Sequence, residues 1–166
     1  MKARCDSIER AKAVAESLGC RALPDQRQQD TYFHCPTGRL KLRQIDGQPA
    51  QLIWYDRRDR ADARSSTYFV LPVDDPAALK TLLERALGVR ATVRKHRAIY
   101  LFRNARIHLD QVSGLGTFIE IEAVLEAPGE EAEGRRLVSH LRKRFGIQRH
   151  DLLSRSYSDM LENAGP

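Results

Sequence analysis

Apolar residues recur at helical spacing in four segments of the chain. Each segment begins or ends with residues that are typical of helix termini, such as Pro76 in a first turn and Gly88 after a last one. The segments therefore predict amphipathic helices. The predicted helices run from Ser7 to Gly19, from Asp75 to Gly88, from Glu130 to Phe145 and from Asp151 to Leu161.

Between the helices, short apolar runs are separated by turn residues and predict strands. Asp46-Gly47, Asn104-Ala105 and the segment from Ser113 to Gly116 have the composition of tight turns, so neighbouring strands can pair as antiparallel hairpins. We therefore expect an α+β fold with a mostly antiparallel sheet. The predicted strands are Arg39–Ile45, Gln51–Asp56, Ser66–Val73, Thr92–Phe102, Arg106–Val112 and Thr117–Leu125.

Charged side chains share one face of several predicted strands. Because side chains alternate across a strand, Arg39, Lys41 and Arg43 lie on one face, opposite Leu40 and Leu42. Such a face often simply meets water in an antiparallel sheet. These faces contain few Ser, Thr or Gln residues, however, and this composition favours a functional site. The other charged sets are Lys95 with Arg97, Arg106 with His108 and Asp110, and Glu120 with Glu122.

The composition is that of a folded protein. The 166 residues are 42% hydrophobic, and this length suits a single domain over residues 1–166. No apolar run approaches the roughly 18 residues of a membrane helix, and the first residues lack the apolar stretch of a secretory signal. We therefore expect a cytoplasmic protein with no membrane partner. Cys5, Cys20 and Cys35 have no metal-binding spacing and are expected to be free thiols.

The formal net charge of +6 permits an anionic partner, and the arrangement of the charges decides which kind. Arg135, Arg136 and the basic run 142–144 fall on a predicted helix, where a solvated face explains them better than a nucleic-acid stripe. Aromatic residues, which stack on bases in many RNA-binding proteins, make up 7% of the chain. We expect no nucleic-acid partner.

A barrel with the charged faces inside would require a charged ligand, because buried charges are costly unless they are paired. A linear triphosphate suits converging Arg and Lys side chains, since guanidinium groups bind phosphate oxygens in a two-pronged manner. The carboxylates would repel phosphate directly, but they could hold Mg²⁺ or Mn²⁺, which bridges acids to phosphates. The charge pattern thus favours a site for a triphosphate and a divalent metal.

Specific motifs occur in order from about Lys2 to Leu161. They are Gln29–Phe33 followed by Gly38–Arg43, then Arg94–Arg97, Arg106–Val112, Leu115–Glu122 and Ser156–Leu161. In order and spacing, these motifs resemble the CYTH family of triphosphate tunnel proteins, which includes class IV adenylate cyclases and thiamine triphosphatases. The resemblance implies a closed antiparallel β-barrel of about eight strands, the triphosphate tunnel, with flanking α-helices. It also implies activity on organic or inorganic triphosphates with a divalent metal.

By matching position, the resemblance assigns roles to the charged residues. Catalytic roles would fall to Lys2, Lys95 and Asp110. The cofactor would be Mg²⁺ or Mn²⁺, held by Asp110, Glu120 and Glu122. Phosphates would be bound by Lys41, Arg43, Lys95, Arg97 and Arg106.

Lys2 resembles the lysine of the opening Glu-x-Glu-x-Lys motif of the family, but only Met1 precedes it here. Either the start has been placed too far downstream, which would truncate the N-terminal strand, or the chain binds without turnover. The complete set of cations and the remaining acids favour the first explanation. We expect a metal-dependent enzyme that acts on nucleotide or other organic triphosphates, by cyclase-like conversion of ATP or by hydrolysis. The alternative is a non-catalytic polyphosphate- or nucleotide-binding protein. The oligomeric state is left open.

Overall fold

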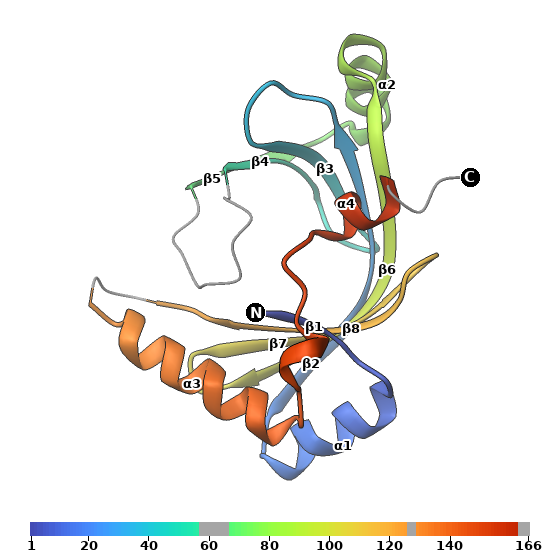
Figure 1. Ribbon diagram of the computed structural model, residues 1–166. Coiled ribbons are helices and arrows are strands. Elements are labelled where there is room, and N and C mark those ends of the chain that lie inside the picture. Colours follow the sequence, from blue (N-terminus) through green and yellow to red (C-terminus); the bar gives the residue numbers. More distant parts are fainter. Residues whose placement is uncertain (57–66, 126–128, 163–166) are drawn as a thin grey trace.

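The computed structural model describes residues 1–56, 67–125 and 129–162, which form an α+β fold around one antiparallel sheet (Figure 1). The sheet has eight strands in the order β1-β8-β7-β6-β2-β3-β4-β5. Ser66, where one predicted strand begins, lies outside the described residues. The strands are β1 (Lys2–Arg4), β2 (Arg21–Phe33), β3 (Arg39–Ile45), β4 (Ala50–Asp56), β5 (Thr67–Val73), β6 (Val89–Phe102), β7 (Ala105–Val112) and β8 (Gly116–Ala123).

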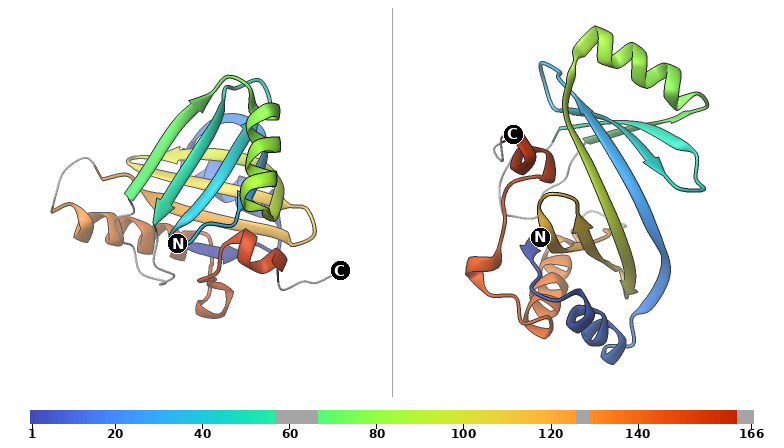
Figure 2. Two further views of the ribbon diagram at one scale, coloured as in Figure 1. Left: turned by 90° about the horizontal axis from the view of Figure 1, so that it is seen from above. Right: turned by 90° about the vertical axis from the view of Figure 1, so that its right-hand side faces the viewer.

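The long strands β2 and β6 join the two parts of the sheet. They pair from Arg21 opposite Leu101 to Phe33 opposite Val89, with β7, β8 and β1 on one side and β3, β4 and β5 on the other. Figure 2 shows these two strands running between the end that carries α2 and the end that carries α1 and α3. The sequence pattern did not predict β2, because Pro24 and the polar run 25–30 hide any alternation of apolar residues.

Three of the predicted helices are confirmed with small differences at their ends. In α1 the Ser7 hydroxyl accepts a 3.1 Å hydrogen bond from the Arg10 N–H, and in α2 the Asp75 carboxylate accepts one of 2.9 Å from the Ala78 N–H. These caps explain where each helix begins. The helices are α1 (Ile8–Ser17), α2 (Pro76–Leu87), α3 (Glu131–Arg144), the 3₁₀ helix η1 (Arg149–Asp151) and α4 (Tyr157–Glu162).

The fourth predicted helix is wrong over its first half. Leu152 forms an isolated antiparallel bridge with Ala3, and the Leu153 N–H donates a 2.9 Å hydrogen bond to the Lys2 carbonyl. These contacts with β1 hold the chain extended after η1, so α4 begins only at Tyr157. Tertiary pairing therefore overrides the local helical spacing of this segment.

Helices α1, α2 and α3 cover one face of the sheet, here called the outer face. Helices α1 and α3 pack against β7 and β8, where Leu137 and Leu141 lie in one buried cluster with Ile107 and Ile121. Helix α2 covers β3 and β4 at the other end through Leu83 and its neighbours (Figure 2). The alternate side chains of the same strands face away from these helices onto the opposite face, here called the inner face.

The sheet has two ends, β1 and β5, and the hydrogen bonds of the described residues do not join them. The expected closure into a barrel is therefore not confirmed, whereas the expected eight antiparallel strands are. Strand β5 leaves Tyr68, Phe69, Val70 and Leu71 exposed at its end of the sheet. Within the described residues, no helix has both the length and the apolar character that crossing a bilayer requires.

Candidate functional site

The inner face of the sheet gathers charged side chains that are buried. Lys41, Lys95 and Arg97 are each 7% exposed, whereas Asp30 is 1% exposed and Asp110 is fully buried. Such burial is rare for charged residues unless they are paired. We call this group the charged interior. Its members are Lys2, Asp30, Lys41, Arg43, Lys95, Arg97, Asp110 and Glu120.

Asp30 lies at the centre of one half of the charged interior. Strand β2 runs between β3 and β6, and therefore brings Asp30 next to cations from both neighbours. The Asp30 carboxylate accepts two 2.8 Å hydrogen bonds from the Arg43 guanidinium and one of 3.1 Å from Lys41 Nζ. Lys95 Nζ lies 3.7 Å from the same carboxylate. One acid thus gathers cations from two strands.

These contacts and burial shift the pKa values of both partners. Burial alone would raise the pKa of Asp30, but the Lys41 charge and the hydrogen bonds from Arg43 hold it well below its usual range. Burial lowers the pKa of Lys41 to about 7, and the positive charges of Arg43 and Lys95 act in the same direction. Together they outweigh the attraction of Asp30, which raises this pKa. Lys41 is therefore poised to change its charge near neutral pH.

Arg97 links two acids in the other half of the charged interior. Its guanidinium donates two 2.6 Å hydrogen bonds to the Asp110 carboxylate and a third, of 2.8 Å, to Glu120. Burial alone would lower the pKa of Arg97, but the hydrogen bonds to Asp110 and the charges of both acids raise it. Arg97 is therefore a fixed cation with its planar group held by two neighbouring strands.

Lys2 and His108 complete the surroundings of Glu120. The pairing of β1 with β8 places Lys2 opposite Glu120, and Lys2 Nζ lies 3.3 Å from its carboxylate. Burial would raise the pKa of Glu120, but the nearby His108 and the charges of Lys2 and Arg97 hold it well below its usual range. Glu120 is therefore ionised at neutral pH.

Tyr157, at the start of α4, reaches into the charged interior. Its hydroxyl donates a 2.8 Å hydrogen bond to Asp110, and its ring packs on Phe118 with 5.0 Å between centroids. Lys2 Nζ lies 3.7 Å from the ring centroid and Lys95 Nζ lies 5.5 Å from it. Burial and the nearby acids raise the pKa of Tyr157, so its hydroxyl keeps its proton and remains a donor.

A separate ion-pair network holds α4 in this position. The Asp159 carboxylate lies 3.0 Å from Arg39 on β3 and 2.8 Å from Arg90 on β6. Arg90 also contacts Glu162 at 2.6 Å. Burial would raise the pKa of Asp159, but hydrogen bonds from Ser156 and the two arginine charges lower it. The network therefore ties α4 to the two strands that supply the interior cations.

The structure brings together most of the predicted site residues, but places two of them at the margin. The charged interior contains Lys2, Lys41, Arg43, Lys95, Arg97, Asp110 and Glu120. Arg106 and Glu122 are exposed and lie opposite each other on β7 and β8. His108 lies between the two groups, with Nε2 3.7 Å from Glu122 and Nδ1 3.9 Å from Glu120.

Sequence reasoning assigned no role to Asp30 or Tyr157. Asp30 lies in a motif that the resemblance included, and its position opposite Arg43 appears only once β2 is identified as a strand. Tyr157 also lies within a motif, but its contact with Asp110 joins residues that are distant in sequence, and no local pattern reveals such a contact. For Asp30, the available signal was its spacing. It lies two residues after Gln28, so in a strand the two side chains would share one face, in a chain whose other predicted strands carry cations on one face.

The acids of the charged interior do not form a metal centre by themselves. Across the described ranges, no group of three or more His, Cys, Asp or Glu residues is placed to hold a metal ion. Arg97 and Tyr157 together occupy both oxygens of Asp110. Glu120 and Glu122 share one face of β8, and Mg²⁺ is often bound by one or two carboxylates plus substrate phosphates. This donor set fits a metal that is shared with a phosphate ligand.

Comparison with known proteins agrees with this fold. The CYTH domain family matches residues 2–157, and the chain belongs to this family. Among curated proteins, it is 26% identical over 151 residues to adenylate cyclase CyaB of Aeromonas hydrophila, covering 86% of this chain and 76% of that one.

Solved structures from two archaea share the fold. The PH1012 protein of Pyrococcus horikoshii superposes with a TM-score of 0.84 and 25% identity, covering 95% of both chains. A conserved protein of Pyrococcus furiosus superposes with a TM-score of 0.83 and 19% identity, covering 95% of this chain and 96% of that one. The fold is thus shared between sequences of low identity.

Proposed function

We propose that this protein is a metal-dependent enzyme that acts on nucleotide or other organic triphosphates. The observation that carries the proposal is the excess of cations in the charged interior. The cations of this group outnumber its carboxylates. The cations are Lys2, Lys41, Arg43, Lys95 and Arg97, and the carboxylates are Asp30, Asp110 and Glu120. A polyanion would supply the charge that this interior lacks, and membership of the CYTH family supports a triphosphate.

The contacts suggest how the residues divide the work. Lys41, Arg43, Lys95 and Arg97 would bind the phosphates inside, and Arg106 would reach them from the exposed margin. Lys2 and Lys95 would stabilise the negative charge that develops where the phosphate bond breaks. Asp110 holds Arg97 through both oxygens, and this geometry favours a positioning role for it.

Glu120 and Glu122 would hold Mg²⁺ or Mn²⁺ together with the phosphates. Such an ion neutralises phosphate charge and makes the phosphorus more electrophilic. Asp110, also expected as a metal ligand, already accepts two hydrogen bonds from Arg97 and one from Tyr157, so it would share its carboxylate between these donors and the ion. The protein's own part is to hold the phosphates between β3 and β6 so that the nucleophile approaches in line.

The nucleophile determines which reaction occurs. The ribose 3′-hydroxyl of ATP would give cyclic AMP and pyrophosphate, whereas water would give ADP and phosphate. The relative from Aeromonas hydrophila is named an adenylate cyclase, and this supports the first reaction. Incubation with ATP and Mg²⁺ or Mn²⁺, followed by chromatography of the products, tests both, and EDTA should abolish turnover.

Binding without turnover is the second candidate. It is favoured by the three hydrogen bonds that already engage the Asp110 carboxylate and by the absence of a three-residue metal cluster from the described residues. In that case triphosphates would bind, and no organic triphosphate would be converted with either metal. Equilibrium binding of ATP beside the product assay separates a binder from an enzyme.

A prefixed variant separates the candidates further. Met1 and Ile121 exchange backbone hydrogen bonds of 2.7 and 2.9 Å, so a residue added before Met1 would lie opposite Glu122. By strand alternation it would share the inner face with Lys2. Adding Glu-x-Glu before Met1 would therefore place one carboxylate opposite Glu122 and the other two residues further along the same face. A large gain of turnover would exclude the pure binder, whereas unchanged inactivity with intact ATP binding would exclude the enzyme.

A further inference from the structure

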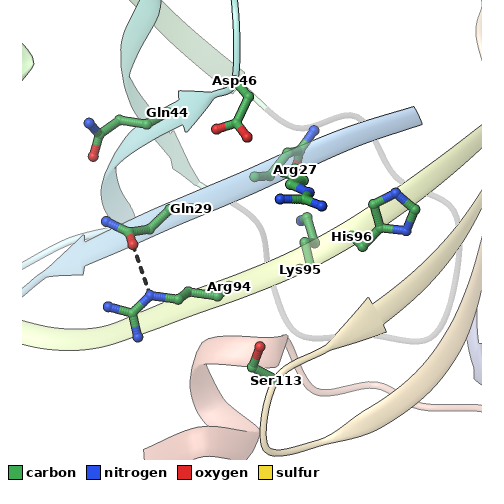
Figure 3. Close-up of a pocket in the computed structure, with 9 residues that line it drawn as sticks. Arg27, Gln29, Gln44, Asp46, Arg94, Lys95, His96 and Ser113 are labelled. Atoms are coloured by element: carbon green, nitrogen blue, oxygen red, sulfur yellow. Dashed lines mark hydrogen bonds between the residues drawn. The ribbon is translucent and has the colours of Figure 1, made fainter. Parts of the chain in front are cut away.

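The outer face of the β2–β6 ladder carries a groove of about 460 Å³ (Figure 3). It lies between the part of the outer face that α1 and α3 cover and the part that α2 covers. Arg27, Arg94 and His96 line it, with Ser113 from the β7–β8 turn on one side and Asp46 from the β3–β4 turn on the other. We call it the outer groove.

The register of the strands shows that these cations face away from the charged interior. Arg27 pairs with His96 and Gln29 with Arg94, whereas the intervening pair is Gln28 with Lys95. Side chains alternate along a strand, so the flanking pairs project to the opposite face from Lys95. Their burial agrees, because Arg27, Arg94 and His96 are exposed and Lys95 is 7% exposed.

The cations of the outer groove are weakly neutralised. Arg94 Nε donates a 2.9 Å hydrogen bond to Gln29 Oε1, which orients the guanidinium and leaves its terminal nitrogens for a ligand (Figure 3). Within the described ranges, neither Arg27 nor Arg94 forms an ion pair. His96 Nε2 lies 3.4 Å from the Asp25 carboxylate. In contrast, Arg43 and Arg97 of the charged interior each bind a carboxylate through two guanidinium nitrogens.

We propose that the outer groove is a second binding site, for the phosphate groups of a nucleotide. Two guanidinium groups can each bind a phosphate in a two-pronged manner, and His96 adds a third polar contact. The volume lies within the range of about 300–1,000 Å³ that is typical of small-molecule sites. At the far side, Gln44 and the Asp46 carboxylate offer acceptors for ribose hydroxyls or a base amino group.

Calorimetric titration with inorganic pyrophosphate and with ADP tests the proposal. The test variant is Arg27→Gln with Arg94→Gln. The matched control is Arg135→Gln with Arg136→Gln, which removes the same charge from the exposed side of α3. Both pairs are exposed, so both proteins should fold as the wild type does. We expect the control to keep every binding event, and the groove variant to lose one event or weaken it at least about tenfold.

Two further measurements make the result specific. Chemical-shift changes on adding ADP should appear at the Ser113 and Asp46 amides in the control and be absent in the groove variant. Arg43→Gln, in the charged interior, should leave this event intact, so a failure of the triphosphate site is read separately. Equal stoichiometry and affinity of the groove variant and the control for both probes would overturn the proposal. A groove that binds pyrophosphate as tightly as ADP would support the phosphate contacts and refute the ribose or base contacts.

Discussion

The Tyr157 hydroxyl donates its hydrogen bond to Oδ2 of Asp110, the same oxygen that Arg97 Nη2 contacts at 2.6 Å. A residue of the last helix therefore shares one carboxylate with a residue of the central sheet. The ion pairs of Asp159 fix α4 on β3 and β6, so this sharing does not depend on Tyr157 alone. The helix and the charged interior form one connected structure.

Replacement of the Tyr157 hydroxyl should cost stability without disturbing the packing. Tyr157→Phe keeps the ring on Phe118 and removes one donor from Asp110, so the free energy of unfolding should fall by about 1 kcal/mol. Tyr157→Ala also removes the ring and should lower it by about 3 kcal/mol or more. Urea unfolding measures both. Equal stability of Tyr157→Phe and wild type would show that the hydrogen bond contributes nothing.

Asp30→Asn should destabilise the protein strongly, because it leaves Lys41, Arg43 and Lys95 buried without their shared counter-charge. The expected loss in free energy of unfolding is about 3 kcal/mol. Asp74→Asn removes the same charge at an exposed position and should change stability by less than about 0.5 kcal/mol. Denaturant titration of the two variants compares them directly. A small effect of Asp30→Asn would mean that these cations are already solvated by water and do not need the Asp30 charge.

Triphosphate binding should take up a proton above neutral pH. The pKa of Lys41 is about 7 in the free protein, and a nearby phosphate favours the charged amine and raises that pKa. At pH 8 the complex therefore binds more protons than the free protein, with at most about one of them on Lys41, and affinity falls as pH rises from 7 to 9.

Calorimetry at pH 8 in two buffers of different ionisation enthalpy measures this proton uptake. Lys41→Met should reduce it, with any remainder due to Lys95, whose pKa is also lowered by burial. Identical binding heats in the two buffers would contradict the assigned role of Lys41.

Neutralising Glu122 and neutralising Glu120 should have different effects on the free energy of unfolding. The Glu122 side chain is 54% exposed, so Glu122→Gln should leave stability within about 0.5 kcal/mol while lowering metal-dependent turnover by about 10- to 100-fold. Glu120→Gln breaks contacts with Arg97 and Lys2 and should lower both stability and turnover. Thermal unfolding and a metal titration of activity separate the two effects. Unchanged turnover in Glu122→Gln would identify it as a solvated surface residue.

Alternation along single strands was enough to predict much of the charged face. Lys41 and Arg43, and likewise Lys95 and Arg97, are separated by one residue, and the structure places each pair inside as that spacing requires. Arg106 and Glu122 follow the same rule, but they lie near one end of their strands, where the face opens to solvent. Alternation predicts on which face of the sheet a side chain lies, but not how deeply it is buried.

Long-range pairing explains what the sequence could not reveal. Strand β2 is polar on both faces, because Arg27 and Gln29 line the outer groove while Gln28 and Asp30 face inward, so no apolar periodicity marks it. The segment after η1 is extended because it pairs with Ala3, which is distant in sequence. Both features arise from contacts between remote parts of the chain.

The charged interior draws its side chains from strands between β1 and β8, and Tyr157 of α4 contacts it from near the other end of the chain. No fragment of the protein contains the complete set, so a ligand of this site recognises only the fully assembled native state. By mass action, such a ligand raises the free energy of unfolding by RT ln(1 + [L]/Kd), or about 2.7 kcal/mol at a hundredfold excess over Kd. The melting temperature thus becomes a label-free report of occupancy, with which nucleoside and inorganic triphosphates can be ranked before any turnover is known.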